Sequence, residues 1–184
     1  MTTTLAPTHL RLTLPPNGIL PEGMSWRIHD GYIRTSTWDT EGESVTLGLW
    51  GPGDLVSASR QGIDPLELQC LTTTIVEQVE PTEEDRGQLI VRELLMVQDL
   101  LLISRIRAAD QRLLELLLWI CRSFGQVNSQ GYRLSFKELN LTHRSLAELC
   151  GLTRVTVTKL LSRFRSEGRL VQVSRDDFVI ARQP

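Results

Sequence analysis

The segment TRVTVTKLL, residues 153–161, combines side chains that can read the edges of DNA bases. The Arg154 guanidinium can donate two hydrogen bonds to guanine O6 and N7, and Val155 can contact a thymine methyl group. Lys159 can reach a base or a phosphate. A solvated helix without a partner usually carries Glu and Lys on this face, whereas no acidic residue follows here until Glu167. The composition favours a helix whose N-terminal turn enters the major groove.

Two short helices joined by a glycine turn are predicted to hold these side chains. Thr142 precedes HRSLAELC and can cap the first helix, and Gly151 supplies the left-handed turn that ends it. Thr153 can cap the second helix, which ends at Gly168. Helical spacing places four apolar residues of the second helix on its buried side: Val157, Leu160, Leu161 and Phe164. The two helices form a helix-turn-helix pattern.

A wing is predicted to follow the second helix. LVQV and FVIA, residues 170–173 and 178–181, alternate as strands around the turn SRDD, whose Arg175 can reach the DNA backbone. We interpret His143 as a capping or phosphate contact, and the threonines in the same way. The predicted DNA-binding residues are Thr142, His143, Arg144, Thr153, Arg154, Val155, Thr156, Thr158, Lys159, Arg163 and Arg175.

Charge is divided unevenly along the chain. Residues 142–184 hold eight Lys and Arg against four Asp and Glu, a net charge of +4, while the whole chain has a net charge of −2. A basic C-terminal module on an acidic body indicates a polyanionic partner, which we take to be double-stranded DNA. The alternative is a winged helix used for protein contacts, and the acid-free face of the second helix favours DNA.

The N-terminal part of the chain is predicted to contain a small sheet. Residues 1–24 carry several prolines and threonines and are expected to form a loosely ordered lead-in. Residues 25–82 contain alternating runs rich in β-branched and aromatic side chains, separated by glycine turns at DTEGE and GPGD. This pattern predicts a short antiparallel β-roll.

A long helix is predicted next, at residues 83–108. Thr82 can cap it, and acidic residues fill its first turn. Apolar residues continue at helical spacing beyond it, and Asp110 is a candidate N-cap where a second helix begins. A long apolar helix after a small sheet usually needs a partner, so we expect a homodimer interface, with packing inside the chain as the alternative. Residues 109–184 then form a winged-helix domain and complete an α+β chain.

Other functional classes find little support in the sequence. No apolar run reaches the ~20 residues that a membrane span needs, so we expect a cytoplasmic protein without membrane contact. Cys70, Cys121 and Cys150 lack metal-binding spacing and are interpreted as reduced core thiols. Motifs of the GxSxG, P-loop, HExxH and GxGxxG types are absent, so no enzyme activity, metal or cofactor is expected.

The order of these elements resembles the CRP/FNR superfamily of bacterial transcription regulators, in which a cyclic-nucleotide-binding-like β-roll, a dimer helix and a winged helix follow one another. The resemblance spans residues 25–184 and is most specific in QRLLELLLWICRSFG and LTHRSLAELCGLTRVTVTKLL. It implies a homodimer on a palindromic DNA site, with RNA polymerase as a further partner. TRVTVTKLL is similar to the nitrogen-control members, which implies base reading by Arg154 and Lys159 at a GTA-type half-site.

The sensor half departs from that family. IDPLELQC, residues 63–70, stands where the cyclic-nucleotide-binding members hold the phosphate with an arginine, so we expect no cyclic-nucleotide binding. The cysteines are too scattered for an iron–sulfur cluster. By the same resemblance, the roll arginine with which the nitrogen-control members hold 2-oxoglutarate falls at Pro65, which leaves Arg92 in the long helix as the candidate to hold an anionic effector. The roll is also shorter than the family's usual roll.

We therefore expect a sequence-specific, DNA-binding transcription regulator that forms a homodimer through residues 83–108. One alternative is an adaptor whose winged helix contacts other proteins. Another is a heterodimer partner of a full-length relative, without ligand sensing.

Overall fold

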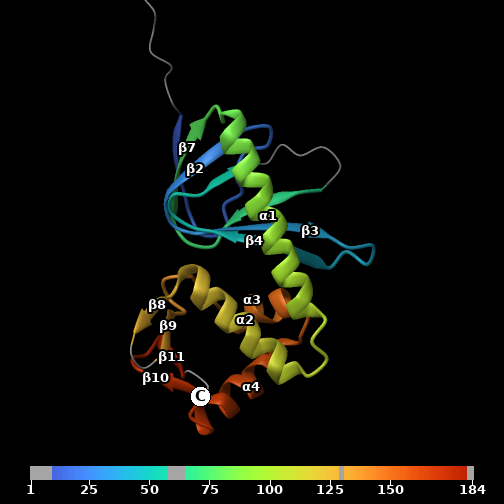
Figure 1. The fold of residues 1–184 in the computed structure, drawn as a ribbon, viewed down its shortest axis with the longest axis vertical. Coiled ribbons are helices and arrows are strands. Elements are labelled where there is room, and N and C mark those ends of the chain that lie inside the picture. The colour runs from blue at the N-terminus through green and yellow to red at the C-terminus, as the bar shows by residue number, and fades with distance from the viewer. Residues whose placement is uncertain (1–9, 58–64, 129–130, 182–184) are drawn as a thin grey trace, which may run out of the picture.

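The computed structural model describes residues 10–57, 65–128 and 131–181. Strands of the N-terminal half form a β-roll, and the C-terminal half combines helices with a small sheet (Figure 1). A long helix, α1 (Glu83–Ser104), runs alongside the roll and leads to the second half. The α+β architecture predicted from the sequence is confirmed.

Within the described residues, the roll consists of two antiparallel sheets. Their strand orders are β1-β7-β2-β5 and β4-β3-β6. The strands are β1 (Arg11–Leu14), β2 (Ser25–Asp30), β3 (Ile33–Trp38), β4 (Ser44–Trp50), β5 (Leu55–Ser57), β6 (Glu67–Cys70) and β7 (Thr74–Val79). Alternation along β2 puts Trp26 and Ile28 into the core, where Ile28 pairs with Val76. The buried Trp50 indole donates to Thr35 Oγ1 at 2.7 Å, so its polar group is satisfied.

The prediction of a loosely ordered lead-in is wrong for the segment from Arg11 to Leu20. β1 pairs antiparallel with β7, from Arg11 opposite Glu77 to Leu14 opposite Thr74. Leu20 is buried, and its backbone amide donates to the Leu68 carbonyl at 3.0 Å. These partners lie more than forty residues further along the chain, so the local proline content does not predict this pairing. Residues 1–9 lie outside the described residues.

The N-terminus of α1 forms at the predicted local signal. Thr82 Oγ1 accepts a hydrogen bond from the Asp85 amide, and the Asp85 carboxylate accepts one from the Thr82 amide. The helix stops at Ser104, so residues 105–108 of the predicted helix form a connection instead.

The second helix, α2 (Ala109–Phe124), begins one residue before the predicted N-cap. Ala108 occupies the N-cap position without a side-chain hydrogen bond, so the prediction of Asp110 as the cap is wrong. Asp110 lies in the first turn, and its carboxylate contacts Arg163 of α4 (Arg154–Ser166) at 2.6 Å. The Asp110 carboxylate also accepts a hydrogen bond from the Gln111 amide at 2.8 Å, so it has both a local backbone partner and a cation distant in sequence.

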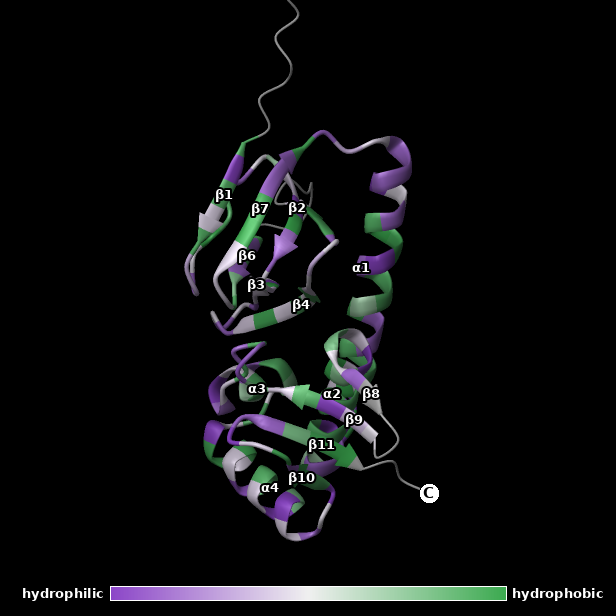
Figure 2. Ribbon diagram, turned by 90° about the vertical axis from the view of Figure 1, so that its left-hand side faces the viewer, coloured by the Kyte–Doolittle hydropathy of each residue, from purple (hydrophilic) through white to green (hydrophobic). Residues whose placement is uncertain are grey.

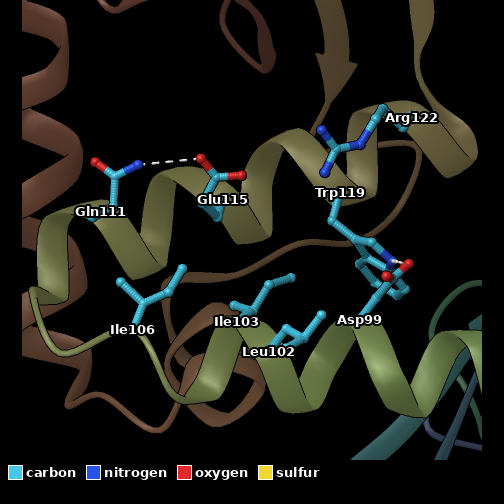
Figure 3. Close-up of a pocket in the computed structure, with 8 residues that line it drawn as sticks. All are labelled: Asp99, Leu102, Ile103, Ile106, Gln111, Glu115, Trp119 and Arg122. Atoms are coloured by element: carbon cyan, nitrogen blue, oxygen red, sulfur yellow. Dashed lines mark hydrogen bonds between the residues drawn. The ribbon is translucent and has the colours of Figure 1, made fainter.

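α1 and α2 face each other across a cavity of about 430 Å³ (Figure 3). The Trp119 indole of α2 donates to the Asp99 carboxylate of α1 at 3.0 Å. Near the start of α2, Arg112 Nε donates to the Ile106 carbonyl in the connection at 2.8 Å. Its Nη1 donates to the Cys150 carbonyl at 3.2 Å, so one side chain joins the connection to the next helix.

The C-terminal half is a winged helix. α2, α3 (His143–Cys150) and α4 pack with a four-stranded sheet of order β10-β11-β9-β8. These strands are β8 (Gln126–Asn128), β9 (Gly131–Ser135), β10 (Leu170–Gln172) and β11 (Asp177–Ala181). The predicted wing is confirmed, with Leu170 opposite Ile180. Phe178 of β11 packs against Phe136 with the rings tilted by 52° and their centroids 4.7 Å apart, which connects the wing to the core.

One side of α1 is not covered by the chain, and bands of apolar residues mark this helix in Figure 2. Its buried residues are Met96, Leu100 and Ile103. The large apolar residues that stay 38–65% exposed are Ile90, Val91, Leu94, Leu95, Val97, Leu101 and Leu102. Four of them follow at intervals of three and four residues, the spacing of a coiled-coil seam, and are called the α1 stripe: Ile90, Leu94, Val97 and Leu101. Contacts within the chain therefore bury only the side of α1 that carries Met96, Leu100 and Ile103.

Candidate nucleic-acid interface

The first turns of α4 present a cationic, apolar and hydroxyl-bearing surface. Its exposed side chains are Arg154, Val155, Thr158 and Lys159. The opposite side is fully buried and consists of Val157, Leu161 and Phe164. No acidic residue lies in the first turn. The structure thus brings the residues predicted to read bases onto one exposed face, while Leu160, predicted to be buried, is only partly covered.

The threonine hydroxyls of α4 have partners within the chain. Thr153 Oγ1 accepts from the Thr156 amide at 3.1 Å and caps α4 as predicted. The hydroxyls of Thr153 and Thr156 are also 2.9 Å apart. The Thr158 hydroxyl donates to the Arg154 carbonyl at 2.9 Å. A phosphate contact by Thr158 would therefore require its hydroxyl hydrogen to leave that carbonyl.

α3 is set against α4 by the predicted cap and turn. Thr142 Oγ1 accepts from the Ser145 amide at 3.0 Å, and Ser145 Oγ accepts from the Thr142 amide at 2.8 Å. Gly151 has φ of 59°, the left-handed conformation that ends α3. The Leu152 amide then donates to the Ala147 carbonyl at 2.9 Å. Both signals predicted from the sequence are confirmed.

His143 links the two helices of the motif. Its Nδ1 lies 2.9 Å from Thr158 Oγ1. Burial lowers the pKa of His143, and the positive charges of Arg165 and Arg154 lower it further. The ring is therefore neutral at pH 7 and contributes a hydrogen bond rather than a charge. Thr142 caps the helix, so the capping interpretation of His143 is wrong, and a phosphate contact stays a prediction.

The cations predicted to contact phosphate are held differently. Arg163 Nη2 lies 2.6 Å from Asp110 Oδ2, and its Nε lies 3.4 Å from Glu167. Arg144 is 83% exposed and lies 3.0 Å from Glu148. Arg175 is exposed in the turn between β10 and β11 and forms no ion pair with the residues that the structure describes. Of the three arginines, it is the most available to a phosphate.

Arg165 is a cation near this surface that was not predicted from the sequence. Arg165 is exposed at the end of α4, two turns beyond Thr158 on the same side, and its guanidinium lies 5.1 Å from the Phe178 ring centre. Its charge acts on His143. The spacing of seven residues from Thr158 could have identified it, because residues seven apart share a helix face.

Arg92, the candidate effector ligand, already has a carboxylate partner. Its Nη1 lies 2.7 Å from Asp54 Oδ1, and its Nη2 donates to Oδ2 at 2.9 Å. Asp54 is buried and also accepts from the Gly51 amide at 2.9 Å. The pair fastens α1 to the roll, and the Arg92 guanidinium lies 5.9 Å from the Trp50 ring centre. An effector anion at Arg92 would have to compete with Asp54, and that role stays a prediction.

The cysteines are isolated and buried. Cys70, Cys121 and Cys150 are free thiols. In the part of the chain that the structure describes, no group of three or more His, Cys, Asp and Glu comes together as a metal site. No helix among the same residues is long and apolar enough to cross a membrane.

Alkylation of Cys121 and Cys150 in the folded protein by iodoacetamide at pH 8 is expected to be at least about 100-fold slower than in the unfolded chain, because only the thiolate reacts. Burial raises the pKa of Cys121 to about 12 and that of Cys150 to about 11. Mass spectrometry after timed quenching measures the number of modified thiols, with the denatured chain as control. Rapid modification of Cys121 or Cys150 in the folded protein would contradict this expectation.

Several known proteins match this sequence, and one family model and two relatives describe the likeness. The model of the Crp-like helix-turn-helix domain matches residues 111–183. The regulatory protein CysR of Synechococcus elongatus is 40% identical over 185 residues, which cover 100% of this chain and 89% of CysR. The global nitrogen regulator of a Synechocystis species is 29% identical over 82% of this chain and 72% of its own length.

Solved structures with the same fold share less sequence. FixK2 from Bradyrhizobium japonicum has a TM-score of 0.75 at 17% identity, covering 94% of this chain and 92% of FixK2. A CRP/FNR-family transcriptional regulator from Thermus thermophilus has a TM-score of 0.70 at 19% identity, covering 94% of each chain. These likenesses extend through both the roll and the winged helix.

Proposed function

Because this chain belongs to the CRP/FNR family of transcription regulators, we propose that it binds a palindromic DNA site as a homodimer and reads it with α4. The observation that carries the proposal is the exposed, acid-free face at the start of α4, where Arg154 and Lys159 flank Val155. An arginine for guanine and a methyl-bearing side chain for thymine suit the major groove. The buried residues of α4 and the caps at Thr142 and Thr153 hold this face rigidly.

The α1 stripe supports the homodimer. An apolar seam with intervals of three and four residues suits a second parallel copy of α1. A two-fold axis along this seam would place two copies of α4 in successive major grooves, about 34 Å apart. RNA polymerase is a further proposed partner, and we place the protein in the cytoplasm with the DNA it binds. We propose no enzymatic activity.

Selection from random DNA duplexes tests this function directly. The expected result is enrichment of one sequence with two inverted half-sites, bound as two chains per duplex. Enrichment of a single half-site would contradict the proposed homodimer. Absence of duplex binding even at low salt would favour the adaptor that acts through protein contacts.

Replacing Arg175 by glutamine is expected to lower the slope of log K against log salt concentration by about 1.8, because each of the two protomers loses one phosphate contact. Sequence preference should not change. Arg163→Gln serves as the matched comparison and should change the slope less, since Asp110 already neutralises Arg163 at 2.6 Å. Fluorescence anisotropy with one labelled duplex at several salt concentrations measures both slopes. An unchanged slope for Arg175→Gln would mean that Arg175 in the wing does not contact a phosphate.

A further inference from the structure

A polar cavity of about 370 Å³ lies between the roll and the winged helix. Both halves of the chain contribute polar side chains to its lining: Asn17, Arg34, Gln69, Asn140, Arg144 and Glu148. At its edge the Asn140 side-chain amide donates to the Leu71 carbonyl at 2.7 Å and joins the two halves. The cavity is separate from the Arg92–Asp54 pair and from the exposed face of α4.

Arg34 of β3 is a buried cation with an unsatisfied donor. The residue is only 8% exposed. Its Nη1 lies 2.7 Å from Glu148 Oε2, and its Nη2 donates to Gln69 Oε1 at 3.0 Å. Its Nε is buried and has no hydrogen-bond partner among the described residues. A buried donor of a charged group is costly when it is left unpaired, which points to an acceptor that the described residues do not supply.

The charges around the cavity leave an excess of positive charge. Glu148 accepts from Arg34 and also from Arg144, whose Nε lies 3.0 Å from Oε1, so two guanidinium groups share one carboxylate. Burial raises the pKa of Glu148, but the hydrogen bonds from both arginines outweigh burial and the pKa is lowered. Glu148 is therefore ionised at pH 7. The α3 N-terminus, represented in the lining by Thr142, adds a partial positive charge.

We propose that this interdomain cavity binds a small oxyanion of the size of sulfate, phosphate or a short dicarboxylate, held by Arg34 and Arg144. An added negative charge completes the ionic balance of the two arginines and Glu148. The described lining contains no aromatic ring on which a nucleotide base could stack, which favours a small anion. Arg34 belongs to β3 of the roll and Arg144 to α3 of the winged helix, so an anion bound by both holds the two halves together.

Isothermal titration calorimetry of the DNA-free full chain tests the site. Sodium sulfate, sodium phosphate and sodium succinate are titrated separately into buffers of matched ionic strength, with sodium chloride as the blank. Wild type should bind at least one oxyanion saturably, and the three titrations distinguish tetrahedral anions from dicarboxylates. Arg34→Gln and Arg144→Gln should each weaken binding by about tenfold or more, since each removes a charge-assisted hydrogen bond. Arg144 is 83% exposed, so its replacement keeps the test valid if Arg34→Gln does not fold.

The matched control is Arg122→Gln, an arginine that lines the separate cavity between α1 and α2 (Figure 3). Its oxyanion affinity should equal that of wild type. No saturable binding in wild type, or an equal loss in Arg122→Gln, overturns the proposal. Loss in Arg144→Gln with full binding in a folded Arg34→Gln also overturns it, because the anion then lies on the exposed surface of α3 and not between the domains.

Discussion

Replacing Arg154 by alanine is expected to weaken binding to the selected duplex by about 1–3 kcal/mol for each half-site and to relax specificity at one base position of each half-site. Arg154 is the first residue of α4, and its side chain is exposed. A bidentate guanidinium–guanine contact carries most of its discrimination in the hydrogen bonds that alanine lacks. The cap of α4 is made by Thr153 and does not involve this side chain, so the fold should be retained.

Anisotropy titrations with the selected duplex and with each single-base variant of one half-site measure this effect. Alanine at position 154 should make the affinities for the four bases at one position converge. Arg165→Ala is the control on the same helix, because Arg165 is exposed but lies at the far end, beside the Phe178 ring. Its loss should weaken all duplexes alike. If Arg154→Ala also weakened all duplexes alike, Arg154 would contact a phosphate and the assignment of base reading would be wrong.

Replacing Leu94 by aspartate is expected to raise the dimer dissociation constant by at least about 100-fold, which corresponds to about 3 kcal/mol. Leu94 lies within the α1 stripe and is 65% exposed in the single chain. A second copy of α1 would cover it, and an unpaired carboxylate in that seam would have no compensating partner. Duplex affinity should fall with the dimer, because one protomer holds only one half-site.

Sedimentation or native mass measurement of the free protein gives the number of chains, and anisotropy gives duplex affinity. Ile19→Asp is the matched control, since Ile19 lies in the roll and is 53% exposed. It should leave both quantities unchanged. A Leu94→Asp protein that stays dimeric would place the interface elsewhere. A wild-type protein that is monomeric alone would favour the heterodimer alternative, which mixing with a full-length relative then tests.

Local sequence signals were sufficient to predict the helix-turn-helix. Capping residues such as Thr142 and Thr153 act on backbone groups within three residues, and Gly151 sets the turn by its own φ angle. The sequence alone therefore contains the information that places them. The wing and the alternation of β2 are local for the same reason.

Contacts between distant residues were not predictable in this way. Asp110 suggests a helix cap locally, but its carboxylate pairs with Arg163, 53 residues later. Arg92 suggests a free cation, yet Asp54 neutralises it across 38 residues. The pair of Arg34 and Glu148 spans 114 residues. Each depends on how the roll, α1 and the winged helix pack, and one sequence gives no local pattern for that packing.

The uncovered α1 stripe bears on how the amount of protein in a cell becomes occupancy of a DNA site. If two chains must associate before they bind, assembled pairs at low abundance vary with the square of the number of chains. Halving the supply of chains then leaves about a quarter of the pairs. A stripe built from Ile90, Leu94, Val97 and Leu101 would thus turn a gradual change in synthesis or turnover into a steeper change in promoter occupancy, before any small molecule acts.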